Sequence, residues 1–262
     1  MKTHKGGFTL IEVALFLAIT GLLFLGVTIG VQNSIFQQRY NDSVQSFVEF
    51  LRGAYAKVEN VQGRSIEEGS GNTNKALYGK LITFGEKLNL TKTTNDNDTV
   101  FMYDIVGDAK CNTGGFQDAI TMLKDSCHAD VLGAIDSGGN RQLLGLAESY
   151  TPKWSAAIQS TAKNKELFKG SIIITRHPQT GTLNTYAAQG RTVEVNNNQT
   201  LKQFLEANVG AFKNSENVDF CINPNGNEIS PVRADVRIKA GARNTSGIEI
   251  IPDDDNQCAD RG

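Results

Sequence analysis

The spacing of hydrophobic residues changes twice along this chain of 262 residues. From Phe8 to Val31 the residues are nearly all apolar, and Glu12 is the only ionisable side chain. As a helix this run would be about 36 Å long, enough to cross a bilayer core of about 30 Å. The pattern therefore predicts one membrane-spanning helix over residues 8–31.

From residue 32 to about residue 62, apolar residues recur at intervals of three and four, which is the spacing of one helix face. Polar and charged side chains take the other faces, so we expect the helix to continue and to pack one face against a sheet. A coiled-coil seam is the alternative, but too few heptads repeat to favour it. The predicted inward-facing residues are Tyr40, Val44, Phe47, Val48, Leu51, Tyr55, Val58 and Val61.

Residues 63–262 are expected to form one globular head built on an antiparallel β-sheet, which makes the fold class α+β. Short apolar runs between Gly-, Pro- and Asn-rich turns are typical of strands. A capping-box pattern at Thr200 predicts a short helix, and residues 114–169 are expected to lie over the sheet as an insertion. The predicted strands are 77–84, 100–106, 172–174, 183–186, 218–222, 232–240 and 248–251.

The charges around the span predict its orientation. Lys2, His4 and Lys5 precede the span, whereas Arg39 is the first cation after it. Under the positive-inside rule the amino terminus stays in the cytoplasm and the head is exported. The chain has 26 basic and 28 acidic residues, so its net charge gives no strong field for nucleic acid or acidic substrates.

All four cysteines, Cys111, Cys127, Cys221 and Cys258, lie on the side that is expected to be exported. An even number in an oxidising compartment favours disulfides, with three possible pairings. Sequential pairing, Cys111 with Cys127 and Cys221 with Cys258, would close one short loop and fasten the carboxy-terminal tail. A zinc site is the alternative, but the cysteines lack C-x-x-C spacing, so no metal site is predicted from them.

The residues "GGFTLIEV", Gly6 to Val13, resemble the amino-terminal methylation motif of type IV prepilins and type II secretion pseudopilins. The resemblance implies a pilin-like fold and a leader, residues 1–7. It also implies that a prepilin peptidase cuts between Gly7 and Phe8 and then methylates the amine of Phe8. An ordinary signal anchor that happens to contain a glutamate is the alternative, and it would keep its first seven residues.

Glu12 corresponds to the glutamate of that family, and its position has a physical reading as well. A carboxylate within a membrane helix is costly, and least so near the interface. Glu12 lies four residues from Phe8, within reach of the amine that cleavage would expose at the positive end of the helix dipole. When subunits pack side by side, Glu12 can instead meet the amine of a neighbour. We therefore predict that it sets the stagger between helices and has no catalytic role.

The resemblance implies a structural subunit, a minor pilin or minor pseudopilin of a type IV pilus or a type II secretion filament. Its partners would be prepilin peptidase, other pilin subunits and the inner membrane, which it would cross once before joining an extracellular or periplasmic filament. The chain carries no recognisable nucleophile, metal-ligand or phosphate-binding motif. We therefore predict no enzyme activity, no cofactor and no small-molecule substrate.

Two binding hypotheses remain beside the structural one. Arg233, Arg237 and Lys239 fall on one face of a predicted strand, and Arg243 follows in the next loop, so a DNA-binding or adhesive minor pilin is the alternative function. The ordinary explanation is the charged solvent face of an edge strand. Asp253 to Asp255 could coordinate calcium, although their spacing is not that of an EF-hand.

Overall fold

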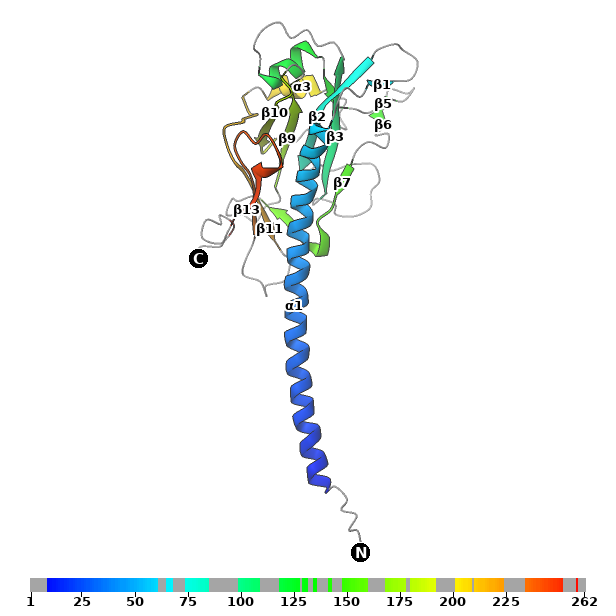
Figure 1. The fold of residues 1–262 in the computed structure, drawn as a ribbon, viewed down its shortest axis with the longest axis vertical. Coiled ribbons are helices and arrows are strands. Elements are labelled where there is room, and N and C mark those ends of the chain that lie inside the picture. The colour runs from blue at the N-terminus through cyan, green and yellow to red at the C-terminus, as the bar shows by residue number, and fades with distance from the viewer. Residues whose placement is uncertain are drawn as a thin grey trace, which may run out of the picture.

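The structure is a computed structural model with a long helix that stands partly outside a mixed α+β head (Figure 1). It describes residues 9–60, 65–67, 74–84, 99–108, 118–127, 129–131, 134–135, 141–142, 148–159, 168–177, 180–191, 201–208, 210–223, 234–251 and 258. The antiparallel sheets and the amino-terminal helix confirm the predicted α+β class.

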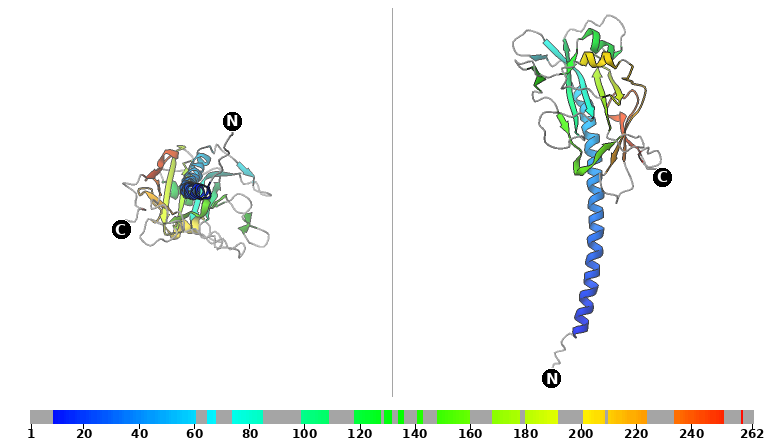
Figure 2. Two further views of the ribbon diagram at one scale, coloured as in Figure 1. Left: turned by 90° about the horizontal axis from the view of Figure 1, so that it is seen from below. Right: turned by 180° about the vertical axis from the view of Figure 1, so that it is seen from behind.

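Helix α1, Leu10–Glu59, is a single helix that would measure about 75 Å from end to end. It begins at the N-cap Thr9 and ends at Asn60, whose backbone N–H and side-chain amide both donate to the carbonyl of Ala56. Its amino-terminal half extends away from the head, and its carboxy-terminal half runs along the strands (Figures 1 and 2). The predicted continuation of the span into the head is therefore confirmed.

The predicted inward face of α1 is also confirmed. The seven predicted residues that the structure describes, all those except Val61, are buried against the head. Burial begins at Tyr40, which marks the point where the helix enters the head. The buried residues are Tyr40, Val44, Phe47, Val48, Leu51, Tyr55 and Val58.

The larger sheet is antiparallel throughout its described pairings, and it contains the first four predicted strands. Its main order is β10-β9-β2-β3-β4, with β1 pairing β2 and β7 pairing β3. The strands are β1 Ser65–Glu67, β2 Asn74–Phe84, β3 Val100–Asp108, β4 Asp130–Val131, β7 Glu148–Tyr150, β9 Gly170–Arg176 and β10 Leu183–Gln189.

The carboxy-terminal strands form a second antiparallel sheet in the order β13-β12-β11-β8. Strand β12 lies between two neighbours, so the expectation that its charges cover an edge strand is wrong. Two further short strands, β5 Ala134–Ile135 and β6 Arg141–Gln142, pair with each other. The strands of the second sheet are β8 Ala157–Gln159, β11 Val218–Asn223, β12 Ala234–Ile238 and β13 Ile248–Ile251.

The main core lies where α1 meets both sheets. Four phenylalanines hold this junction together: Phe47 from α1, Phe84 from β2, Phe220 from β11, and Phe168, which precedes β9. The ring of Phe220 lies 5.4, 5.1 and 4.6 Å from those of Phe47, Phe84 and Phe168. Aromatic pairs at these separations stabilise a core beyond the area they bury, so the helix and the two sheets form one packed unit.

A second core lies on the opposite face of the larger sheet. It is covered by α2, Ala119–Thr121, by the π-helical turn Met122–Ser126, and by α3, Leu201–Ala207. Residues 118–127 of the predicted insertion therefore lie over the larger sheet as expected, but its strands β4, β7 and β8 do not, because β4 and β7 pair within the larger sheet and β8 pairs within the second. Helix α3 confirms the short helix predicted after Thr200. The strand residues of this core are Tyr78, Leu81, Tyr103, Ile105, Ile173 and Tyr186.

A bulge in β2 explains why Tyr78 belongs to the second core. The pairing of β2 with β3 shifts between Leu77 and Gly79, which leaves Tyr78 outside the regular register. A side chain at Gly79 would place its Cβ 2.2 Å from the carbonyl oxygen of Ile174 on β9. Glycine at this position therefore permits the close approach of β9 at the bulge.

Candidate assembly helix and head surface

The amino-terminal half of α1 is the largest exposed apolar surface that the structure describes. Among residues 9–39, none whose exposure is described is buried. Sixteen large hydrophobic side chains are exposed here, from Leu10 at 89% to Phe36 at 36%. By length and composition, α1 is the one described helix that could cross a membrane. A water-soluble monomer rarely exposes so large an apolar surface, so this half of α1 requires lipid or other apolar helices around it.

The two threonines within the apolar run of α1, Thr20 and Thr28, satisfy their hydrogen bonds within the helix. Thr20 donates to the carbonyl of Phe16 at 2.8 Å, and Thr28 donates to the carbonyl of Phe24 at 2.7 Å. Neither hydroxyl therefore interrupts the apolar character of the surface, because back-bonded threonines present mainly their methyl groups.

Glu12 forms a capping box with Thr9 at the start of α1. The carboxylate oxygen Oε2 accepts from the backbone N–H and from the hydroxyl of Thr9, both at 2.9 Å. In return, the backbone N–H of Glu12 donates to Thr9 Oγ1 at 3.4 Å. The other oxygen, Oε1, accepts no hydrogen bond from any residue that the structure describes. Glu12 thus closes the helix start and still has one carboxylate oxygen free.

The capping role was not predicted, although the sequence contains its signal. A T-x-x-E pattern directly before an apolar run is the mark of a capping box, and Thr9 to Glu12 match it. Gly7 and Phe8, the predicted cleavage residues, lie outside the described residues, so the junction itself stays a prediction.

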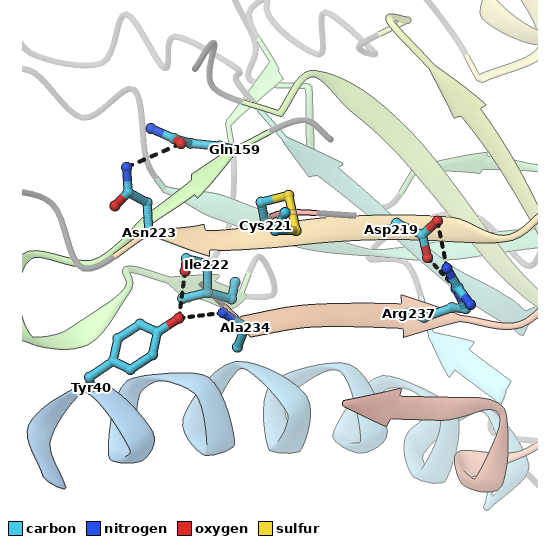
Figure 3. The surroundings of a disulfide bond; sticks show 9 residues. Tyr40, Gln159, Asp219, Cys221, Ile222, Asn223, Ala234 and Arg237 are labelled. Atoms are coloured by element: carbon cyan, nitrogen blue, oxygen red, sulfur yellow. Dashed lines mark hydrogen bonds and ion pairs between the residues drawn. A yellow bond between two sulfur atoms is a disulfide. The ribbon is translucent and has the colours of Figure 1, made fainter. Parts of the chain in front are cut away.

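Hydrogen bonds attach the buried half of α1 to both sheets. The hydroxyl of Tyr40 donates to the carbonyl of Ile222 on β11 at 2.7 Å and accepts from the backbone N–H of Ala234 on β12 (Figure 3). Further along, Tyr55 donates to the hydroxyl of Thr185 on β10 at 2.7 Å, which in turn donates to the carbonyl of Ala242. The helix is therefore fixed to the head at both ends of its buried face.

Burial raises the pKa of Tyr55 to about 12, although the hydrogen bond to Thr185 acts in the opposite direction. The phenol therefore keeps its proton at neutral and mildly alkaline pH, and this attachment does not titrate in that range.

A charge network lies between α1 and the larger sheet. Lys80 on β2 and Asp104 on β3 are cross-strand partners and form an ion pair in which only 6% and 14% of their side chains are exposed. The ammonium of Lys80 also lies 3.6 Å from a carboxylate oxygen of Glu148 on β7. Glu148 accepts a hydrogen bond from Lys57, near the end of α1. Four charges from four elements are thereby joined.

The pKa of Glu148 lies below its usual value. Partial burial acts to raise it, but the hydrogen bond from Lys57 and the charges of Lys57 and Lys80 outweigh that effect. A carboxyl whose pKa is lowered by folding stabilises the fold above its unfolded pKa, and this contribution is lost as pH falls through the folded pKa.

We expect the replacement Glu148→Gln to reduce the loss of stability on acidification. The free energy of unfolding of the wild type should exceed that of the variant at neutral pH, and the difference should shrink below about pH 4.3, the ordinary pKa of glutamate. Denaturant titrations at a series of pH values would measure the difference. Glu49→Gln, at an exposed position on α1, is the control. A pH-independent difference for Glu148→Gln would contradict the expectation.

The four predicted basic contact residues do not form an open cationic stripe where they are described. Arg237 is paired with Asp219 across β12 and β11 (Figure 3), and Lys239 is paired with Glu249 at 2.6 Å. Arg243 is exposed and forms no ion pair with a described residue. Arg233 lies outside the described residues. The described part of the stripe therefore contributes one unpaired cation.

The predicted disulfide between Cys221 and Cys258 is confirmed, with the two Cα atoms 5.4 Å apart. Cys221 lies on the face of β11 opposite α1, whereas Ile222 faces the helix (Figure 3). The bond ties the tail to the outer face of the second sheet, and a crosslink of this loop length contributes about 3–4 kcal/mol. Cys127 is also disulfide-bonded. Cys111 lies outside the described residues, so its pairing stays a prediction.

The structure gives no further support to the calcium hypothesis. Asp253 to Asp255 lie outside the described residues. Among the residues that are described, no group of three or more His, Cys, Asp or Glu side chains could hold a metal ion. Of the candidate sites, the exposed half of α1 with Glu12 at its start is the one that the described residues support.

Comparison of the chain with protein-family models, curated proteins and solved structures finds no match.

Proposed function

We propose that this chain is a structural subunit of a pilin-like filament, a minor pilin or minor pseudopilin. In this proposal a prepilin peptidase cuts the precursor between Gly7 and Phe8, and the mature chain assembles through α1. The observation that carries the proposal is α1 itself. It has an apolar half that packs against no other described part of the chain, a single carboxylate at its start, and an unbroken continuation into the core of the head.

The exposed half of α1 suits two successive environments. Before assembly, its apolar surface would lie among lipid chains of the inner membrane, with the head on the exported side. In a filament, the same surface would pack against the equivalent helices of other subunits. Both environments are apolar, so transfer between them requires no exposure of this surface to water, and close packing can decide the balance.

Glu12 would provide the specificity that apolar packing lacks. Its Oε2 atom is held by Thr9, and its Oε1 atom has no described partner. Cleavage would give each subunit a charged amine at Phe8. An amine of a neighbouring subunit that meets Oε1 would form an ion pair in an apolar environment, where a displaced neighbour leaves two charges unpaired. This difference would fix the stagger of adjacent helices.

The attachment of α1 to the head would convert helix stagger into head position. Tyr40 and Tyr55 join the helix to both sheets, and the phenylalanine cluster at Phe47 fills the junction. A subunit placed by its helix therefore also places its head. The alternative of DNA binding gains no support from the head surface, because Arg237 and Lys239 are neutralised by carboxylates.

Processing is the first expectation to test. In membranes that contain a prepilin peptidase, the chain should lose residues 1–7 and begin at N-methyl-Phe8, as measured by mass spectrometry of the intact chain and of its amino-terminal peptide. The variant Gly7→Val should accumulate as uncut precursor, because a branched side chain would stand at the cleaved bond. Gly6→Ala, one residue earlier, should still be cut. A wild-type chain that keeps Met1 to Gly7 in such membranes would refute the proposal.

A further inference from the structure

Trp154 differs from the other aromatic residues of the head. It is the only tryptophan in the chain, and 55% of its side chain is exposed. Outside α1, only one other large hydrophobic side chain among the described residues is exposed, namely Ile250. Within the head, Trp154 is therefore the most exposed large apolar group that the structure describes.

The backbone at Trp154 holds the indole outward. Its φ and ψ are 58° and 36°, the left-handed region, and no other non-glycine residue among those described has a positive φ. The short 3₁₀ turn Lys153–Ser155 lies between Pro152 and Ala156, which are both buried. The backbone N–H of Ala156 donates to the carbonyl of Lys153 at 3.2 Å. A strained residue held by buried neighbours on both sides suggests that its orientation has a function.

The contacts of the preceding strand place Trp154 at the end of the head that is nearest to the exposed half of α1. Near the carboxy-terminal end of α1, Lys57 contacts Glu148 at the start of β7. Nearer the membrane-spanning half, Phe50 of α1 stacks on Tyr150 at the end of β7, with the ring centres 5.0 Å apart. Still nearer, Arg39 of α1 lies over Trp154. The chain from β7 to Trp154 thus runs down α1 from its carboxy-terminal end to the point where the helix leaves the head. Figure 1 shows the segment that follows β7 at this lower end, beside α1.

The surroundings of Trp154 match the interfacial layer of a membrane. The guanidinium carbon of Arg39 lies 4.7 Å from the centre of the indole. Lys153, the residue before Trp154, is exposed, and Asp42, three residues after Arg39 on α1, is exposed as well. On the amino-terminal side of Arg39, the exposed side chains of Phe36 and Ile35 continue the apolar surface towards the membrane-spanning run. Tryptophan prefers the boundary between headgroups and hydrocarbon, and basic side chains are attracted to anionic lipid phosphates.

The axial distances are compatible with this contact. Arg39 lies about 12 Å along the helix from Val31, where the apolar run ends. The headgroup layer extends about 5–7 Å beyond the hydrocarbon on each side. Membrane helices are tilted by about 20° on average. A tilt of this size towards the Trp154 side brings the indole a few ångströms closer to the bilayer. The ring then lies about 8–9 Å from the hydrocarbon, at the outer edge of the headgroup layer.

We propose that the turn of residues 151–156, called here the Trp154 turn, rests in the lipid headgroups on the exported face of the membrane before assembly. Trp154 inserts its ring, while Arg39 and Lys153 contact lipid phosphates. The contact holds the head at a fixed tilt relative to the bilayer. This inference rests on the proposed membrane crossing of α1.

The single tryptophan permits a direct test on the full chain, reconstituted in nanodiscs of phosphatidylethanolamine and phosphatidylglycerol. A headgroup spin-labelled lipid should quench the emission of Trp154 about twofold or more, as expected for an interfacial indole. Iodide should quench it less in nanodiscs than in detergent. Equal iodide quenching in both, with no effect of the spin label, would overturn the proposal. Quenching that appears only when several chains share one disc would indicate contact with a neighbouring subunit and would also overturn it.

A second chain separates this inference from the proposed function. In Phe24→Trp combined with Trp154→Phe, the only tryptophan lies in the apolar half of α1. Its quenching by lipids brominated in their acyl chains reports membrane insertion alone. If lipids brominated in their acyl chains quench this variant but the headgroup label does not quench Trp154 in the wild type, the Trp154 contact is refuted and the membrane crossing stands. If neither kind of quenching is observed, the membrane crossing itself is refuted.

The basic residues provide a matched control. The double variant Arg39→Gln, Lys153→Gln should reduce headgroup quenching of Trp154 in discs that contain phosphatidylglycerol, because the attraction to anionic lipid is lost. In discs of phosphatidylcholine alone, the variant and the wild type should differ less. If the wild type and the variant were quenched equally in both lipid compositions, the two cations would have no role in the contact.

Discussion

Replacing Glu12 with glutamine is expected to leave the chain folded and cleaved but to keep it out of filaments. Glutamine can fill the same position of a capping box, so the bonds with Thr9 that close the start of α1 are retained. What the variant loses is the negative charge that would pair with the amine of a neighbouring subunit. Removing one partner of a buried, hydrogen-bonded charge pair typically costs 2–5 kcal/mol, so incorporation should fall by on the order of tenfold or more.

The measurement is the fraction of the chain that sediments with filaments sheared from cells with the native assembly machinery, compared with the fraction left in the membrane. Mass spectrometry of the membrane fraction would confirm that Glu12→Gln is still cleaved. Thr9→Val is the opposite control, because it removes the hydroxyl that caps the helix and keeps the carboxylate. If Thr9→Val were excluded from filaments and Glu12→Gln incorporated normally, the capping box would be the important feature and the charge-pairing argument would fail.

The sequence allowed the helix and most strands to be predicted because their patterns are local. The apolar run from Phe8 and the stripe from Tyr40 to Val58 each follow from a fixed spacing, and α1 shows both. The strands predicted over 172–174 and 183–186 also followed from local signals, namely two apolar runs around a Pro- and Gly-containing turn, and they pair as β9 and β10. The disulfide Cys221–Cys258 was one of three possible pairings, so the sequence favoured it but could not select it alone.

The features that escaped prediction depend on contacts between distant segments. The position of β12 inside its sheet depends on β13 and β11, and a charged strand face looks the same at an edge and in the interior. The left-handed backbone of Trp154 has no local sequence signal, because residues other than glycine rarely adopt it. Nothing in the local sequence marks Lys80 as part of a charge network, because Asp104 and Glu148 come beside it only through β3 and β7.

The replacement Lys80→Met is expected to destabilise the head by about 3–5 kcal/mol, because it leaves Asp104, whose side chain is only 14% exposed, without its cation. Lys80 has only 6% of its side chain exposed and lies near two carboxylates, so water cannot replace the lost charge readily. Denaturant unfolding of the full chain in detergent, followed by circular dichroism, would give the change in free energy. Lys57→Met is the control. Lys57 pairs with Glu148, but 46% of its side chain is exposed, and ion pairs at such exposure contribute about 0–1 kcal/mol.

The double variant Lys80→Met, Asp104→Leu distinguishes a penalty of unpaired charge from a loss of packing. Replacing both members of a buried pair with apolar residues of similar volume is often neutral or stabilising, so the double variant should recover most of the stability that Lys80→Met loses. If it remained as unstable as the single variant, the methylene groups of Lys80 would matter more than its charge. Recovery would mean that the network contributes little net stability, and that its role is to fix how β2, β3 and β7 align beneath α1.

This alignment matters for the proposed subunit because Glu148 also binds Lys57, and β7 leads from there to the Trp154 turn. A change at Lys80 should therefore also alter the headgroup quenching of Trp154, even though the two residues do not touch.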